Sequence, residues 1–234
     1  MLRPMHFPVP GLLALANRVA RTLLPPVCQI CAEPGEQDRE LCAACCLALP
    51  WHTDACARCA ASLPEDAAAL CFRCEESPPL LDAAWAGLRY EDPISGLLLR
   101  YKFHEDLAAG RLLAQLMVLS PPPWDAAPLV AVPLYPSRLR RRGYDQAAQL
   151  ARRLGLPCWQ GLYRVRATLP QSERSADARR HNLDGAFAVR GDVPKAVVLV
   201  DDVMTTGSTL LACAEALRNA GCQDVRAWVC ARVP

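Results

Sequence analysis

Apolar and polar positions follow different patterns in the two main parts of the chain. Residues 28–82 contain few long aliphatic side chains and show no regular period, whereas residues 83–234 alternate short apolar runs with segments of helical spacing. We expect strands at 85–90, 129–132, 197–200 and 225–231, and helices at 94–103, 107–119, 146–154 and 208–220. This alternation predicts an α/β fold with a mostly parallel sheet flanked by helices.

The N-terminal residues 1–27 have a pattern of their own. Leu, Ala and Val recur at helical spacing between residues 12 and 23, and Pro25 and Pro26 stop the amphipathic helix that this spacing predicts. The helix can pack its apolar stripe on the domain behind it, which is the interpretation we favour, or it can lie in a membrane interface. No uninterrupted apolar run reaches membrane-spanning length.

Composition and charge narrow the class of protein. The 234 residues are 52% apolar, which is enough for the core of one large or two small domains and excludes disorder as the dominant state. The formal net charge is only +2, but it is unevenly distributed. Residues 138–190 hold twelve arginines and four acids, whereas residues 28–82 hold ten acids and three basic residues. The chain therefore has one acidic and one basic segment.

Cysteine is unusually frequent, and its spacing indicates metal binding. Eight of the 13 cysteines form four C-x-x-C pairs, and the last two pairs repeat the first two at an offset of 28 or 29 residues. Zinc prefers four tetrahedral ligands, so each repeat unit can supply one all-cysteine site. We predict two structural Zn²⁺ ions, one bound by Cys28, Cys31, Cys42 and Cys45 and the other by Cys56, Cys59, Cys71 and Cys74. Cys46 is an alternative to Cys45.

The segment 28–82 cannot bury enough apolar surface to fold alone, so we expect the two metal ions to fold it as a double zinc ribbon. A disulfide framework is the alternative, but residues 1–27 lack the layout of a secretory signal. A redox role is disfavoured because redox C-x-x-C motifs come singly at the end of a strand. Thiols that stay reduced long enough to bind zinc indicate a cytoplasmic protein.

Chemistry-bearing residues follow the strand predicted at 197–200. The chain continues Asp201, Asp202, Val203, Met204, Thr205, Thr206, Gly207, Ser208, Thr209 and then enters a predicted helix. Paired carboxylates can bind vicinal hydroxyls or lie near Mg²⁺, and a hydroxyl-rich glycine turn presents amides to an anion at a helix N-terminus. A sugar phosphate satisfies both groups at once. Taken separately, a strand-end Asp is often a simple cap and the turn is an ordinary one.

Residues 197–209 as a whole resemble the ribose-phosphate signature of type I phosphoribosyltransferases, and they do not match a Walker motif. By that resemblance Asp201 and Asp202 would hold the ribose hydroxyls of phosphoribosyl pyrophosphate and serve as the catalytic carboxylates. The 5′-phosphate would be cradled by Thr205, Thr206, Gly207, Ser208 and Thr209.

A run of arginines follows the strand predicted at 129–132 and ends at Arg142 and Gly143. We interpret this run as a loop that binds the diphosphate, because arginine pairs well with phosphate. The alternative is a compositional bias, since 24 of the 26 basic residues are arginine. Against that background Lys102, one of two lysines, is a candidate point charge for a phosphate, although a solvated lysine at a helix end is the simpler interpretation.

Together these motifs are similar to those of the ComF family, which is associated with competence. The resemblance covers nearly the whole chain and rests on the doubled cysteine segment and on residues 99–103, 141–146, 171–187 and 197–209. It implies a type I phosphoribosyltransferase fold for residues 83–234, behind a double zinc ribbon at 28–82 and an amphipathic helix within 1–27. It also implies phosphoribosyl pyrophosphate as the ligand, with Zn²⁺ and Mg²⁺ as cofactors.

The resemblance implies a phosphoribosyltransferase-like protein linked to DNA uptake in natural transformation. As an enzyme it would displace pyrophosphate at the anomeric carbon, with magnesium and Arg142 on the leaving group. Either the zinc segment or residues 171–182, interpreted as a mobile loop, would close over the site. The sequence indicates no acceptor.

The competing hypothesis is a non-catalytic competence module with phosphoribosyl pyrophosphate as ligand or regulator. It would carry single-stranded DNA on its basic face and work with competence or DNA-translocation proteins. Few aromatic residues interleave with the arginines, which disfavours base stacking. A transcriptional regulator on a transferase fold is a third hypothesis, but the chain has no helix-turn-helix signature.

Overall fold

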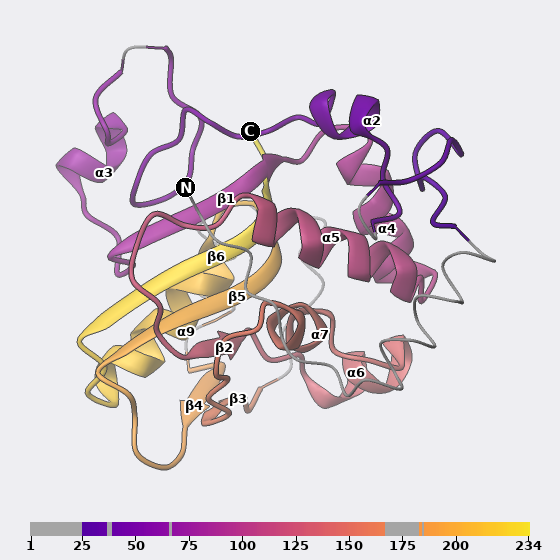
Figure 1. The fold of residues 1–234 in the computed structure, drawn as a ribbon. Coiled ribbons are helices and arrows are strands. Elements are labelled where there is room, and N and C mark those ends of the chain that lie inside the picture. The colour runs from indigo at the N-terminus through magenta and orange to yellow at the C-terminus, as the bar shows by residue number, and fades with distance from the viewer. Residues whose placement is uncertain (1–24, 37–38, 66, 167–182, 184) are drawn as a thin grey trace. The chain divides into compact units, whose positions relative to one another are not determined.

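The computed structural model describes residues 25–36, 39–65, 67–166, 183 and 185–234. They belong to two compact units, Met1–Ala48 and Leu49–Pro234, which are described separately (Figure 1). The helix predicted between residues 12 and 23 and the closing loop predicted at 171–182 lie outside the described residues. Within the described ranges, no helix is both long and apolar enough to cross a membrane.

A four-stranded parallel sheet with the strand order β1-β6-β5-β2 forms the centre of the unit 49–234 (Figure 1). The strands are β1 (Ala83–Arg89), β2 (Leu129–Ala131), β5 (Ala196–Met204) and β6 (Asp224–Arg232). Each coincides with a predicted strand. The central strands β5 and β6 are buried along most of their length, as expected for a parallel sheet covered on both faces. In contrast to the prediction, β5 continues past Val200 through both acids to Met204.

Helices cover both faces of this sheet. On one face α5 (Leu107–Leu119) packs on β1 and β6, and α7 (Gln146–Arg153) packs on β2 and β5. α4 (Ile94–Phe103) packs against α5 on this same side. On the other face α9 (Ser208–Asn219) packs on β5 and β6. Asp106 and Asp145 begin α5 and α7, since each carboxylate accepts a hydrogen bond at 2.9 Å from the amide three residues later. The predicted α/β class and all four predicted helices of this unit are confirmed.

The arginine run after β2 is a helix, so the prediction of a loop was wrong. This helix, α6 (Pro136–Arg142), has proline in its first turn and ends at Gly143, whose φ of +75° is left-handed. Proline at a helix start and glycine just past the end are standard boundary signals, and Leu and Arg have good helix propensity. The sequence contains both boundary signals, Pro136 and Gly143, but the many charged residues between them favoured the interpretation as a loop.

A second, two-stranded sheet pairs β3 (Leu162–Arg164) with β4 (Phe187–Val189) in antiparallel fashion. We did not predict these strands. Three residues are too few to show an alternating pattern in the sequence. The pair brings Arg164 opposite Phe187, with the guanidinium 5.3 Å from the ring centroid.

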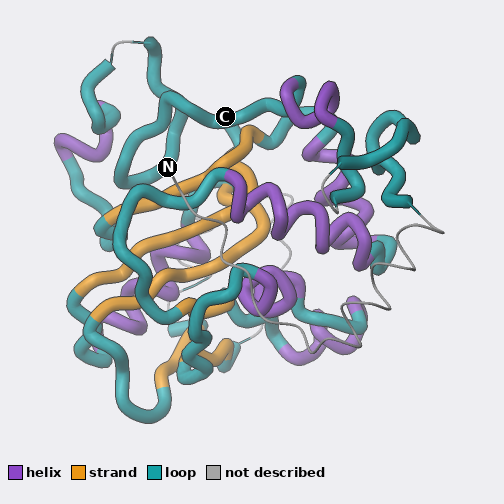
Figure 2. Tube along the Cα trace, in the orientation of Figure 1, coloured by secondary structure: helices purple, strands orange, loops and turns teal. Residues whose placement is uncertain are grey.

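The cysteine-rich residues 25–82 are mostly loop, with two short helices, α2 (Ala43–Leu47) and α3 (Phe72–Glu76) (Figure 2). The predicted repeat recurs in the backbone, because the bridge between Val27 and Pro34 has its counterpart 28 residues later in the bridge between Ala55 and Ser62. The second copy is part of the compact unit that contains the sheet. It is joined to β1 by a hydrogen bond from the amide of Ala84 to the carbonyl of Ala57 at 2.9 Å.

Candidate functional site

Eight cysteine sulfur atoms form two groups, and within each group the four Sγ atoms lie within 4.8 Å of one another. The groups are Cys28, Cys31, Cys42 and Cys45, and Cys56, Cys59, Cys71 and Cys74. The Cys31–Cys42 and Cys59–Cys71 sulfur pairs are 3.6 and 3.7 Å apart. A disulfide is about 2 Å long, whereas two thiolates at about 2.3 Å from one tetrahedral Zn²⁺ lie about 3.8 Å apart. The predicted groups are therefore confirmed, with Cys45 and not Cys46 as the fourth member of the first.

The thiols of each group ionise unequally. Burial opposes ionisation of Cys28 and Cys56, but hydrogen bonds from backbone amides outweigh it and lower their pKa to about 6 and about 7. The pKa of Cys45 is raised, mainly by the side chain of Cys31, and that of Cys74 is raised by burial and by Cys59. Once one thiol has ionised, its interactions with the neighbouring thiols oppose their ionisation. A bound dication supplies the positive charge that allows all four to be thiolates.

Two adjacent cavities lie at the carboxyl end of β5, and Asp201 lines both of them. The smaller cavity, about 30 Å³, is formed by residues of the segment 201–210. The larger cavity, about 110 Å³, also takes in Val132, Pro133 and Leu134, which follow β2. Parallel pairing of β2 with β5 places these two strand ends side by side. Ligands of α/β sheets bind at this edge.

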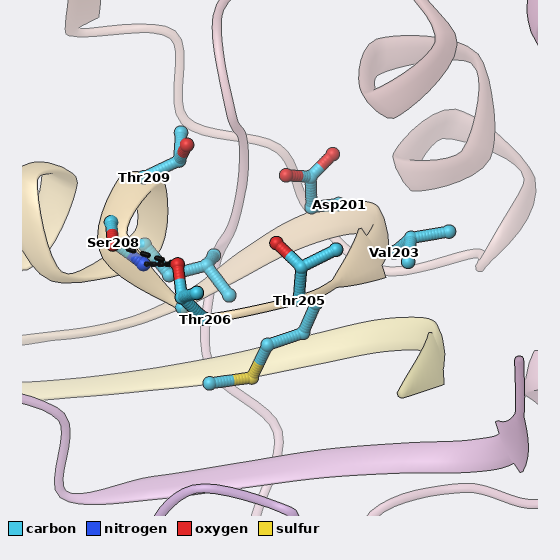
Figure 3. A pocket seen from close by; sticks show the side chains of 9 residues that line it. Asp201, Val203, Thr205, Thr206, Ser208 and Thr209 are labelled. Carbon is cyan, nitrogen blue, oxygen red and sulfur yellow. Dashed lines mark hydrogen bonds between the residues drawn. The ribbon is translucent and has the colours of Figure 1, made fainter. Parts of the chain in front are cut away.

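The turn between β5 and α9 forms the smaller cavity (Figure 3). Gly207 has a φ of +76°, a left-handed backbone conformation that strongly favours glycine. The hydroxyls of Thr206 and Ser208 are hydrogen-bonded at 2.8 Å. Within the described part of the chain, no backbone carbonyl accepts a hydrogen bond from the amides of residues 205, 206, 207 or 209. These donors at the start of a 12-residue helix can bind an anion.

A charged cluster lies where the two cavities adjoin. Lys102, at the end of α4, donates to Oδ1 of Asp202 at 3.0 Å, and the side chain of Asp202 is 9% exposed. Although burial opposes it, the carboxylates of Asp202 and Asp201 raise the pKa of Lys102. Burial and the charge of Asp202 raise the pKa of Asp201 to about 8. Asp202 is thus paired with a cation, whereas the surroundings of Asp201 favour its protonated form.

Cationic side chains from three elements line the larger cavity: Lys102 from α4, Arg138 and Arg142 from α6, and Arg164 from β3. Arg142 donates to Oε1 of Gln146 at 3.2 Å, and its guanidinium lies 5.5 Å from the ring centroid of Phe103. Burial, and then the charge of Arg138, lower the pKa of Arg164. Four cationic side chains face two carboxylates, those of Asp201 and Asp202, so basic groups are in excess around the cavity and favour an anionic ligand.

Two buried donors of this cavity lack an acceptor. Nε of Arg142 and Nε2 of Gln146 are inaccessible to solvent and have no hydrogen-bond partner among the described residues. Buried polar groups are normally paired, because an unpaired donor costs about 1–3 kcal/mol. Both residues line the larger cavity.

The structure brings most of the predicted phosphate-site residues to this edge of the sheet. Asp201 and residues 205–209 line the smaller cavity, and Asp202, Lys102, Arg142 and Thr209 line the larger one. Gly143 lines neither cavity and instead ends α6. Sequence reasoning missed Arg138, Arg164 and Gln146. Arg138 and Arg142 are four residues apart, so a prediction of α6 would have placed both side chains on the same face of the helix.

Comparison with known proteins identifies the family of this chain. Residues 139–234 match the family described as phosphoribosyl transferase domain, and residues 19–75 match that described as double zinc ribbon domain. Competence protein F of Haemophilus influenzae is 36% identical over 180 residues, which cover 69% of this chain and 78% of that protein. DNA utilization protein YhgH of Salmonella typhi is 34% identical over 224 residues, covering 89% and 98%. The chain belongs to the ComF family.

Membership in the ComF family confirms the resemblance found in the sequence. A further relative, competence protein ComFC of Streptococcus pneumoniae, is 26% identical over 140 residues, covering 59% of this chain and 63% of its own. The parallel sheet with helices on both faces is a type I phosphoribosyltransferase fold, and the two cysteine groups are those of a double zinc ribbon with structural Zn²⁺.

Zinc content tests the assignment of the first group. We expect two zinc ions per chain in the wild type and one in a Cys45→Ser variant, because three thiolates leave the tetrahedral site incomplete. The matched control, Cys46→Ser, should keep both ions. Metal analysis by mass spectrometry of the purified chains gives the counts. Loss of zinc from the control, or its retention in Cys45→Ser, would contradict the ligand set.

The raised pKa of Asp201 predicts a pH dependence of stability. The native state holds a proton up to a pH of about 8, whereas the unfolded chain releases it above about 4, so rising pH favours unfolding within this window. Asp201→Asn has no proton to lose and should become more stable relative to wild type as the pH rises. Urea unfolding at about pH 6 and about pH 8.5 measures the difference, with exposed Asp125→Asn as control. A difference that stays constant between the two pH values contradicts the prediction.

Proposed function

We propose that this chain binds phosphoribosyl pyrophosphate together with Mg²⁺ across the two adjacent cavities. The observation that carries the proposal is that Asp201 lines both cavities. On one side of it is a turn whose amides donate to no described carbonyl, and on the other is a cavity lined by arginines and Lys102. Phosphoribosyl pyrophosphate carries a phosphate, vicinal hydroxyls and a diphosphate in that order. The protein offers anion-binding amides, carboxylates and arginines in the same order.

The ribose phosphate would lie over the β5–α9 turn. Amides and hydroxyls of residues 205–209 would donate to the 5′-phosphate, with the start of α9 contributing its dipole. Asp201 and Asp202 would accept hydrogen bonds from the ribose hydroxyls. The ion pair of Asp202 with Lys102 engages Oδ1, and the carboxylate oxygens can accept hydrogen bonds from the ribose.

The diphosphate would occupy the larger cavity. Arg142 lines it with an Nε that has no acceptor in the described structure, and Arg138 and Arg164 line it as well. Guanidinium groups bind phosphate oxygens through charge-assisted hydrogen bonds. The sequence predicted a diphosphate-binding loop, whereas here two of the arginines belong to the helix α6.

The two carboxylates also fit a magnesium ion. Mg²⁺ prefers hard oxygen ligands. Burial, and then the charge of Asp202, raise the pKa of Asp201, and a dication would offset both by favouring the ionised carboxylate. Asp201 and Asp202 are therefore the residues that would hold it near the ligand. When bound, the ion would neutralise part of the charge on the diphosphate.

The reaction that follows from this arrangement is displacement at the anomeric carbon. The bond between C1 and the diphosphate oxygen breaks, pyrophosphate leaves with the electron pair, and a nucleophilic atom of the acceptor forms the new bond to C1. Arg142 and its neighbours would stabilise the departing charge. The Asp201 pair would fix the ribose as positive charge develops on the sugar.

Thermal unfolding tests ligand binding directly. Phosphoribosyl pyrophosphate with Mg²⁺ at about 100 times its dissociation constant should raise the melting temperature by about 5 °C. An Asp201→Ala/Asp202→Ala variant should lose that shift, and Asp125→Asn should keep it. An unchanged wild-type melting temperature refutes binding, and an equal shift in the double variant refutes the site. Release of pyrophosphate in the presence of a panel of nucleobases then tests turnover.

We further propose that this activity serves DNA uptake. The names of the relatives support the link, since they are described as competence and DNA utilization proteins. Expression of this chain in Haemophilus influenzae lacking competence protein F should restore transformation, and the Asp201→Ala/Asp202→Ala variant should not. Equal restoration by both chains, at matched expression, would separate DNA uptake from the proposed ligand site.

A further inference from the structure

Arg232, the last residue of β6, joins the second cysteine group to the turn between β5 and α9. Its Nε donates to the carbonyl oxygen of Cys59 at 3.2 Å, and its Nη1 donates to the carbonyl oxygens of Met204, at 3.2 Å, and Thr205. The carbonyl of Val233 is a third acceptor of Nη1, so the two hydrogens of this nitrogen are shared among three carbonyls. Arginine suits this position, because its planar fork carries several donors that can reach separate carbonyls.

These bonds determine which way the peptide groups of the turn point. The carbonyl of Met204 and the amide of Thr205 belong to one planar trans peptide and point in opposite directions, as do the carbonyl of Thr205 and the amide of Thr206. Arg232 holds both carbonyls and so directs both amides away from itself. The Met204 carbonyl also accepts from the amide of Val233 at 3.0 Å, so the amide of Thr206 is the one that depends on Arg232 alone. The amides of Thr205 and Thr206 are two of those that donate to no described carbonyl, and both residues line the smaller cavity. Arg232 therefore orients donors of the anion-binding turn.

The other end of the link is a metal ligand. Cys59 lies in the second cysteine group, and the knuckle that contains it is closed by hydrogen bonds from Cys56 to Ala61 and from Ala60 to Cys56. A third cavity, about 120 Å³, is lined by Cys59 and Cys71 on one side and by Thr206 and Arg232 on the other. Knuckle and turn are thus direct neighbours. Four ligands on one ion fix the knuckle backbone, including the carbonyl that Arg232 contacts.

We propose that the second zinc site acts as a positioning element for phosphate binding, and that Arg232 is the residue that transmits its effect. With zinc bound, the Cys59 carbonyl holds the guanidinium, and the guanidinium holds the turn with its amides toward the phosphate. None of these bonds involves the first cysteine group. The inference rests on the proposed function of the turn, and it adds a role for a metal site that would otherwise only stabilise the fold.

Two probes separate the turn from the rest of the site. Ribose 5-phosphate tests the turn, and inorganic pyrophosphate tests the cavity lined by arginines, both by calorimetry on the zinc-loaded full chain. Arg232→Gln should weaken ribose 5-phosphate binding about tenfold and leave pyrophosphate binding within about twofold, because its effect is confined to the turn. Arg232→Lys should recover part of the loss, since an ammonium still donates to carbonyls. Arg226→Gln, on the same strand beside Asp224, is the matched control and should bind both probes as the wild type does.

The outcomes distinguish the two proposals. If the wild type does not bind ribose 5-phosphate, the proposed function fails. If it binds and Arg232→Gln binds equally well, or loses both probes alike, the positioning role of Arg232 is overturned.

Removal of each metal in turn tests the zinc side of the proposal. Cys59→Ser/Cys71→Ser and Cys31→Ser/Cys45→Ser should each retain one zinc ion, but only the former should show weakened ribose 5-phosphate binding with pyrophosphate binding preserved. Equal affinity of the two variants for ribose 5-phosphate refutes the role of the second site. If the former variant fails to fold, the comparison of Arg232→Gln with Arg232→Lys decides the proposal.

Discussion

Parallel pairing of β5 with β2 on one side and β6 on the other is the constraint on which the candidate site depends. The register matches Ala131 with Val200 and Met204 with Arg232, so three strand ends meet at one edge. The chain after β2 brings the arginines of α6, β5 leads into the turn proposed to bind phosphate, and β6 ends at Arg232, which donates to carbonyls at that turn. The apolar run 197–200, fully buried between helices, fixes that pairing. A slip in register would separate these groups even if each local structure survived.

The sequence predicted well whatever depends on local pattern. The central strands and four helices appear where apolar runs and helical spacing indicate them, and the zinc ligands appear where cysteine spacing indicates them. Spacing works for the cysteines because each knuckle binds its metal within a short segment. The helix α6 was misread because a charged face without an apolar stripe resembles a loop, although Pro136 and Gly143 indicated its ends.

Contacts between distant segments could not be predicted in this way. Lys102 and Asp202 are one hundred residues apart, and no periodicity connects them. Arg164 lies on a three-residue strand, and its place beside Arg138 exists only after the strand pair β3–β4 and the sheet have formed. Such residues gain their role from tertiary structure, so a sequence read segment by segment can name the chemistry of a site but not all of its members.

The two zinc ribbons differ in the part of the structure that must open before the metal ion can dissociate. The two copies share their turns and short helices, yet the first belongs to a unit of 48 residues, whereas the second is hydrogen-bonded to β1 and β6 of the sheet. Local opening of a small unit is a low-energy event, while freeing the second copy requires disruption of the core. The two ions should therefore exchange with solvent at very different rates. Two copies of similar sequence would then differ in how fast they lose zinc, and the slower site would be the one next to the β5–α9 turn.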